Sequence, residues 1–397
     1  MDAPNELDGG RTMFDYGSAP MQADRGVGWK VVRSFGDVFQ AADGVWYLSS
    51  PEAVTFAARH PEIFASGPAF EFLGSPVPLV PLAIDPPDHR RFRKVLDPLL
   101  APRVVNELDV QLRQQIADLV ARVAGSGRCD VMADIARLYP TSVFLTLFGM
   151  PATDRDMFID WVETVNSGTA GAEPTPEVAA AGQQLFGYLQ AFIDQKRAAP
   201  GDDMLSHILS LTGDEAWTDA EMLGMCFLFT LAGLDTVTAA IGFMMSYLAR
   251  DADLRRRVVA DPAAAATFIE EIVRLEPPAP TTVRVTMADT EVCGVRIPAG
   301  SMCQIAWGAA NRSPERGDHA DRVNLDAPDV GHFGFGSGIH RCVGSHLARR
   351  ELRLVLEEFH RQIPDYQLAD GFEPRVVFPS ATYHFSELPL TFAVGPS

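Results

Sequence analysis

The clearest pattern of apolar and polar positions lies near the C-terminus. Between Val343 and Ile363 the apolar residues recur every three or four positions, at Ala348, Leu352, Val355, Leu356, Phe359 and Ile363. Because residues at this spacing share one face of an α-helix, the pattern predicts an amphipathic helix. The predicted helix begins directly after a glycine-rich stretch that contains Cys342.

A second run, from Met222 to Leu248, is apolar almost throughout. Thr218 and Glu221 precede it with the spacing of a capping box, which predicts a helix start. The run is also long enough for a transmembrane helix. However, Asp235 lies at its midpoint, where a carboxylate costs about 2.5 to 3.5 kcal/mol on insertion. We therefore expect a helix buried inside a large protein, and no membrane partner.

The remaining chain predicts more helix than strand. The region 104–198 is mostly helical in pattern, and a further helix is expected over 51–60. Runs rich in β-branched and aromatic residues, or alternating in polarity, predict strands at 29–32, 45–48, 280–285 and 376–392. The expected fold is mainly α-helical with a smaller β-rich region. We expect one large domain over 29–397, preceded by a flexible lead-in over 1–28 that has no signal-sequence pattern.

Composition narrows the class of protein. The 397 residues are 47% hydrophobic and carry a net charge of −19, which is typical of a soluble protein and argues against a nucleic-acid partner. The five cysteines include no CxxC pair, so neither a disulfide framework nor a zinc site is indicated: Cys129, Cys226, Cys293, Cys303 and Cys342. A reducing cytoplasm fits this cysteine usage best.

The stretch from Phe333 to Gly344 carries the strongest chemical signal. Four glycines in twelve residues allow the backbone to turn tightly and to approach a flat partner closely. Cys342 then lies at the start of the predicted helix, where the helix dipole favours the metal-binding thiolate. The alternative is a free buried cysteine behind an ordinary glycine loop.

With the spacing FxxGxxxCxG, on Phe335, Gly338, Cys342 and Gly344, this stretch resembles the haem-binding loop of the cytochrome P-450 family. The resemblance implies that Cys342 is the proximal ligand of the iron of haem b and supports cleavage of dioxygen. It also implies that Phe335 packs against the sulfur, that Gly338 and Gly344 make room for the porphyrin, and that His340 reaches a haem propionate.

Residues 85–94 resemble the DPPxHxxxR segment of the same family. His89 and Arg93 are four residues apart and share a helix face, and the resemblance implies that both bind haem propionates. The alternative is a solvated charge run. Arg90, Arg91 and Lys94 remain as a basic spot on an acidic protein, which predicts a docking site for an acidic ferredoxin.

Two further motifs follow in the family's order. Ala232-Gly233-Leu234-Asp235-Thr236 resembles the dioxygen-binding helix, which implies that Ala232 and Gly233 lie at the cofactor and that Asp235 and Thr236 deliver protons. The alternative is that Thr236 only bonds back to a carbonyl one turn earlier. Glu271 and Arg274 resemble the structural Glu-Arg pair, with Arg322 as its third member, although Val323 replaces the expected aromatic residue.

The resemblance extends from about Trp29 to Phe392 and implies further roles. Arg284 would bind a propionate. The expected pocket residues are nearly all apolar and favour a terpenoid, steroid, fatty acid or aromatic substrate: Val77, Leu79, Leu82, Leu228, Leu231, Ala232, Pro280, Val283, Ala381 and Thr382.

We therefore expect a monomeric monooxygenase that uses dioxygen, with electrons from NAD(P)H through a ferredoxin and its reductase. A peroxide-using or isomerising haem-thiolate enzyme, or a non-enzymatic haem sensor, are the alternatives.

Overall fold

The computed structural model describes residues 14–71, 77–168, 174–326 and 331–394. The chain divides into two compact units, each built from separate chain segments. Unit 1 comprises residues 1–69, 270–342 and 375–383, and unit 2 comprises residues 70–269, 343–374 and 384–397. The expectation of one domain over 29–397 stays a prediction.

Unit 1 is built around a small sheet. Its five strands lie in the order β1-β2-β8-β5-β3, and only the β2–β8 pair is parallel. The strands and helices of this unit are β1 (Val38–Gln40), β2 (Trp46–Leu48), β3 (Phe64–Ala65), β5 (Thr282–Thr286), β6 (Thr290–Val292), β7 (Val295–Ile297), β8 (Met302–Ile305), α1 (Arg25–Ser34), α2 (Pro51–Arg59) and α14 (Trp307–Asn311). Leu48, Val54, Phe64 and Ile305 form part of its buried core.

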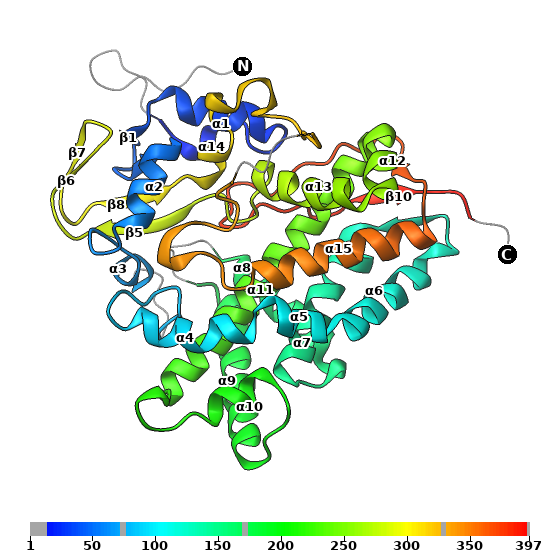
Figure 1. Cartoon of the computed structure of the whole chain (residues 1–397), viewed down its shortest axis with the longest axis horizontal. Coiled ribbons are helices and arrows are strands. Elements are labelled where there is room, and N and C mark those ends of the chain that lie inside the picture. The colour runs from blue at the N-terminus through cyan, green and yellow to red at the C-terminus, as the bar shows by residue number, and fades with distance from the viewer. Residues whose placement is uncertain (1–13, 72–76, 169–173, 327–330, 395–397) are drawn as a thin grey trace. The chain divides into compact units, whose positions relative to one another are not determined.

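Unit 2 is mainly helical. Its principal elements are α4 (His89–Leu99), α5 (Pro102–Glu107), α6 (Asp109–Ala124), α7 (Leu138–Phe148), α8 (Arg155–Asn166), α9 (Pro176–Ala198), α10 (Met204–Leu209), α11 (Asp219–Arg250), α12 (Ala252–Ala260) and α15 (Ser345–Gln362). Helix α15 packs along α6, and α11 packs against α7, α8 and α9 (Figure 1). A three-stranded sheet joins β4 (Arg128–Asp130), β10 (Pro389–Thr391) and β9 (Gln367–Leu368). Helix α3 (Gly67–Glu71) and helix α13 (Pro262–Leu275) each contribute residues to both units.

The helices predicted from periodicity are confirmed. Helix α15 matches the amphipathic pattern, and α11 begins with the expected capping box between Thr218 and Glu221. Helix α11 is long and apolar enough to cross a membrane, yet 67% of its most apolar window is buried in the protein. Burial by protein explains the apolar run without a membrane.

The N-terminal predictions are partly wrong. The strand expected over 29–32 is the second half of α1, which begins after the Asp24 side chain accepts a hydrogen bond from the Val27 amide. The flexible lead-in is wrong for residues 14–28, because Phe14 and Met21 are buried. Residues 1–13 lie outside the described part of the chain. Of the predicted 376–392 hairpin, only β10 forms a strand.

Candidate active site

The loop before α15 contains Cys342. The Cys342 amide donates a hydrogen bond to the Phe335 carbonyl at 2.9 Å, and Cys342 itself is exposed. Helix α15 begins at Ser345 with Gly344 as its N-cap. The cysteine therefore lies two residues before the cap, slightly further from the helix than the sequence pattern predicted.

Two glycines of this loop contact backbone so closely that no side chain fits. A Cβ on Gly338, whose φ is +70°, would lie 1.9 Å from the Ala58 carbonyl oxygen of α2. A Cβ on Gly334 would lie 2.3 Å from the Val273 carbonyl oxygen. That Gly338 makes room for the porphyrin stays a prediction. In the structure the space beside its Cα holds the backbone of α2, so this glycine fixes the loop in place.

The other cysteines are poorly suited to bind a metal. Cys129, Cys226 and Cys303 are buried, and burial raises the pKa of each thiol, for Cys129 and Cys303 to about 12. Cys293 lies in the β6–β7 turn, where partial burial also raises its pKa. Since the thiolate is the ligand form, Cys342 is the cysteine whose exposure and loop suit coordination.

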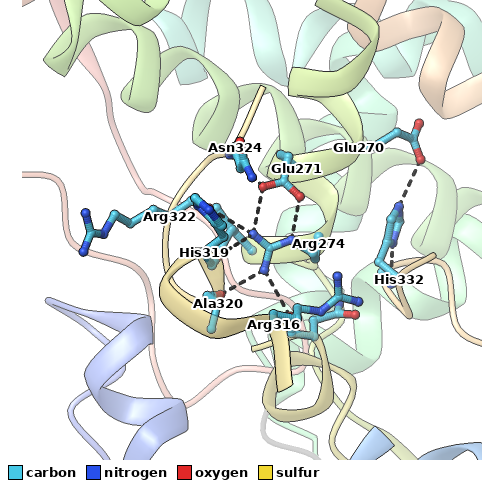
Figure 2. Close-up of polar contacts among 12 residues, drawn as sticks. Glu270, Glu271, Arg274, Arg316, His319, Ala320, Arg322, Asn324 and His332 are labelled. Atoms are coloured by element: carbon cyan, nitrogen blue, oxygen red, sulfur yellow. Dashed lines mark hydrogen bonds and ion pairs between the residues drawn. The ribbon is translucent and has the colours of Figure 1, made fainter. Parts of the chain in front are cut away.

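Figure 2 shows the Glu271–Arg274 pair of α13, which is buried in unit 1. Arg274 Nε donates to Glu271 Oε1 at 2.6 Å, and Nη2 donates to Oε2 at 2.8 Å. The Arg274 guanidinium also donates to four backbone carbonyls, those of Asn311, His319, Ala320 and Arg322. This bidentate arrangement satisfies both charged groups inside the protein.

The predicted role of Arg322 needs correction. Its contribution to the pair is the backbone carbonyl, which accepts from Arg274 Nη2 at 3.0 Å, while its side chain points away in Figure 2. The neighbouring partner of Glu271 is instead the Asn324 amide, which donates to Oε2 at 2.9 Å. The side chain of Arg322 is therefore not the third member of the ion pair.

Sequence reasoning missed the contacts that hold the start of the cysteine loop. His332 Nδ1 accepts a hydrogen bond from the Gly334 amide, so Nε2 carries the proton that it shares with Glu270 at 3.0 Å. The Asn311 side chain accepts from the Phe333 amide at 2.7 Å. Helices α13 and α14 thus fix the loop through Glu270 and Asn311. Neither residue belongs to a motif that the sequence analysis identified.

The propionate candidates lie on different elements. On α4, His89 is buried, and desolvation together with the nearby Arg93 lowers its pKa to about 4, so its ring is neutral at pH 7. Arg93 Nε donates to Asp97 Oδ1 at 2.7 Å. In unit 1, Arg284 of β5 is buried and donates to the Val283 carbonyl, and His340 is half-buried.

Two members of the predicted basic spot are engaged within the protein. Arg91 forms an ion pair with Glu221 and donates to the Ala216 carbonyl at 3.1 Å. Lys94 forms an ion pair with Glu215. These carboxylates offset two of the three charges of the spot, and its role as a docking site stays a prediction.

A second basic surface lies in unit 2. A recess of about 180 Å³ between α5 and α15 is lined by Pro102, Val105, Asn106, His346, Arg349, Arg350 and Arg353, and we call it the α5–α15 recess. Arg350 pairs with Asp109, and Arg353 pairs with Glu357. Three guanidinium groups and one imidazole line this recess, a grouping that the sequence spacing alone did not reveal.

The AGLDT segment lies in the middle of α11. Ala232 and Gly233 are exposed, although most of the helix is buried, and a Cβ on Gly233 would meet nothing within 4 Å. Thr236 Oγ1 donates to the Ala232 carbonyl at 2.7 Å, as the structural alternative expected. The helix is continuous here, without a local opening at Gly233. The Thr236 oxygen still keeps its capacity to accept a hydrogen bond.

The predicted pocket residues divide between the units. Val77, Leu82, Leu228 and Leu231 of unit 2 are half-buried, and Leu79 is buried. In unit 1, Pro280 is buried, Val283 and Thr382 are half-buried, and Ala381 is exposed. That these residues line a substrate pocket stays a prediction.

Comparison with known proteins identifies the family. Residues 264–363, which contain the Glu-Arg pair and the cysteine loop, match the Cytochrome P450 family model. The chain is 32% identical over 326 residues to the vitamin D(3) 25-hydroxylase of Pseudonocardia autotrophica, covering 81% of this chain and 79% of that protein. It is likewise 32% identical over 329 residues to the erythromycin C-12 hydroxylase of Saccharopolyspora erythraea, covering 81% and 82%.

Solved structures agree. A mutant of P450 EryK in complex with erythromycin B superposes with a TM-score of 0.84 at 28% identity, covering 93% of this chain and 96% of that one. The chain therefore belongs to the cytochrome P450 family, and its mainly helical fold, its haem b cofactor and its activity as a haem-thiolate monooxygenase follow from that membership.

Proposed function

We propose that this enzyme hydroxylates a lipophilic small molecule, with Cys342 as the sulfur ligand of haem b. The observation that carries the proposal is the cysteine loop. Gly334 and Gly338 are packed against backbone oxygens too closely for any side chain, and the loop that they fix holds an exposed Cys342 ahead of α15. When bound, haem b supplies the activation of dioxygen that the thiolate supports.

We assign the other predicted site residues to cofactor binding and proton transfer. His89, Arg93, Arg284 and His340 bind the propionates, and Phe335 packs beside the sulfur. Asp235 transfers protons towards Thr236, whose hydroxyl donates a hydrogen bond to the Ala232 carbonyl and keeps its capacity to accept one. The apolar pocket candidates exclude water, which limits the loss of electrons to peroxide.

Two observations support a substrate class: the apolar character of the predicted pocket residues and the names of the related hydroxylases. Bacterial P450 enzymes act in general on lipophilic substrates, and the two relatives above are named for hydroxylation of vitamin D(3) and of erythromycin. We propose that the substrate of this enzyme is a terpenoid, steroid, fatty acid or aromatic compound. We also propose that the enzyme acts in the cytoplasm as a monomer.

Electrons come from NAD(P)H through a ferredoxin reductase and an acidic ferredoxin. The α4 spot and the α5–α15 recess are both docking candidates, because each presents three basic side chains, two of which are paired with carboxylates. An acidic ferredoxin would complement the basic side chains of either surface on an otherwise acidic protein.

The carbon monoxide complex of the reduced protein tests the ligand. The parent should show the red-shifted absorption band of thiolate-bound haem, and Cys342→Ser should abolish it. Cys303→Ser and Cys293→Ser are matched controls that should keep the band. A band that survives Cys342→Ser contradicts the assignment.

A further inference from the structure

Gly224 of α11 touches the main chain of Pro78. A Cβ on Gly224 would lie 1.8 Å from the Pro78 carbonyl oxygen and 2.9 Å from its carbonyl carbon. At such distances repulsion far exceeds any dispersion attraction. Since a backbone carbonyl cannot rotate away as a side chain can, any residue other than glycine would force the two main chains apart.

The other glycines of α11 do not share this property. A Cβ on Gly233 would meet nothing within 4 Å. A Cβ on Gly242 would meet the Sδ atom of Met132 at 2.7 Å, which is a flexible side chain that can adjust. Gly224 is therefore the α11 glycine that sets a backbone-to-backbone distance.

The segment containing Pro78 is held firmly against this contact. Leu79 and Val80, which follow Pro78, are 8% and 0% exposed and belong to the same buried cluster as Met225 of α11. The Ala83 amide donates to the Leu79 carbonyl at 2.8 Å, which closes a turn. The segment cannot shift at Pro78 without disturbing this packing.

The contact also lies beside three of the predicted pocket residues. Val77 and Leu82 flank the buried pair and are half-buried. Leu228, also half-buried, lies one helical turn beyond Gly224, on the same face of α11. The approach of Pro78 to Gly224 therefore fixes how far residues 77–82 stand from Leu228.

We propose that Gly224 is a positioning residue that sets the width of the substrate pocket in unit 2, and so the size of the lipophilic molecule accepted. The inference rests on the proposed function, because it takes Val77, Leu82 and Leu228 as pocket wall. A methyl group at residue 224 would move the 77–84 segment outward, away from α11, and widen this part of the pocket.

The test compares Gly224→Ala with Gly187→Ala. Gly187 lies in α9, where a Cβ would meet nothing within 4 Å, so this control makes the same substitution without the contact. Each protein is titrated with imidazole, 4-phenylimidazole and clotrimazole, following the haem absorption spectrum. Imidazole reports access to the iron alone, and the two larger azoles report the pocket.

In Gly224→Ala the affinity ratio of clotrimazole to 4-phenylimidazole should rise by about tenfold, because the bulky azole gains room and the small one loses contacts. Imidazole binding should be unchanged, and Gly187→Ala should keep the parent ratio. A general loss of stability would weaken all three ligands together. An unchanged ratio in Gly224→Ala overturns the inference.

Hydrogen exchange of the parent protein provides a test that needs no variant, should Gly224→Ala fail to fold. Clotrimazole should slow exchange of the Ala83 amide, whose acceptor is the Leu79 carbonyl, and leave the amides of α9 unchanged. Equal exchange with and without the azole overturns the inference. Failure of the proposed function is distinct from both results, because the parent would then lack the thiolate band with carbon monoxide.

Discussion

The guanidinium of Arg274 forms two hydrogen bonds with the Glu271 carboxylate, at 2.6 and 2.8 Å, and both side chains are buried. The same guanidinium donates to four carbonyls from residues 311–322. One arginine thus links the end of α13 to the chain that leads into the cysteine loop. An isolated ion pair at this spacing on an exposed helix would contribute only about 0.2 to 0.5 kcal/mol to stability. We expect removal of one partner of the buried Glu271–Arg274 pair to cost more, because the other would be left buried without it.

Arg274→Ala should destabilise the protein by about 3 to 5 kcal/mol, because it leaves a buried carboxylate and several carbonyls without their donor. The purified variant should bind less haem, since the loop of Cys342 loses its support. Thermal unfolding and haem content per chain measure the two effects.

Arg322→Ala is the matched control for this prediction. Alanine keeps the carbonyl that accepts from Arg274, and only the outward-pointing side chain is lost. This variant should unfold at nearly the parent temperature. Comparable destabilisation of Arg322→Ala would mean that its side chain does contribute to the pair.

Whether a helix could be predicted from the sequence depends on which residues form its contacts. Helix α15 and helix α11 were predictable because their contacts are made by side chains at helical spacing, with a capping box at Thr218. Helix α1 was missed because two of its buried positions, Arg25 and Gly28, are not apolar, which hides the helical period. Arg25 is buried because it pairs with Glu276, a tertiary partner that no local pattern announces.

The residues of the candidate site also divide into those that motif spacing reveals and those whose partners it does not reveal. The Glu271–Arg274 pair was predictable from motif spacing, and the role of Cys342 stays a prediction. The contacts of Arg322 and Gly338 were not predictable, because their partners are backbone carbonyls, which every residue possesses. The charges of Arg91 and Lys94 were visible in the sequence, but their partners Glu221 and Glu215 lie more than 100 residues away.

The docking candidates can be separated by charge reversal. Arg349→Glu in the α5–α15 recess should raise the ferredoxin concentration needed for half-maximal reduction by about tenfold at low ionic strength, since rim charges act mainly on association. Added salt should reduce the difference between parent and variant.

Lys94→Glu supplies the comparison, because Lys94 is already paired with Glu215. It should leave the ferredoxin dependence close to that of the parent, and both variants should retain their haem. If Lys94→Glu slows reduction more than Arg349→Glu does, the α4 spot is the docking site.

Glu351 of α15 predicts a dependence of stability on pH. Its side chain is buried, its Oε2 atom has no hydrogen-bond partner among the described residues, and burial raises its pKa well above the usual value. The folded protein therefore keeps this proton to a higher pH than the unfolded chain, which releases it above about pH 4.3. Folding then takes up a proton, so this group costs stability as pH rises above that value.

Glu351→Gln removes the titrating group while keeping its shape. Its unfolding temperature relative to the parent should increase between pH 5 and pH 8.

Glu357→Gln is the control of opposite sign. Desolvation raises the pKa of Glu357, but hydrogen bonds from Arg353 and Arg113 outweigh it and lower the pKa overall. This variant should lose stability relative to the parent as pH rises from 3 to 6. A pH-independent difference for Glu351→Gln would mean that Glu351 is not held protonated.

The last prediction concerns the proton path on α11. Thr236 Oγ1 donates to the Ala232 carbonyl at 2.7 Å, and Thr230 makes the same back-bond to the Cys226 carbonyl at 2.8 Å. The two threonines differ in surroundings, because Thr230 is fully buried whereas Thr236 is half-exposed beside the exposed Ala232 and Gly233. A hydroxyl that serves only the helix should behave alike at both positions.

We expect Thr236→Ala to bind substrate and consume NAD(P)H but to release much of the reducing power as hydrogen peroxide, because no hydroxyl remains to hold a proton at this point of the pocket. Thr230→Ala should keep the parent ratio of product to NAD(P)H, whatever its effect on stability. Asp235→Asn should slow turnover by about 10² to 10⁴, the usual contribution of a positioned proton donor. Product and peroxide measured per NAD(P)H decide the matter: equal ratios in Thr236→Ala and Thr230→Ala would assign Thr236 a purely structural role.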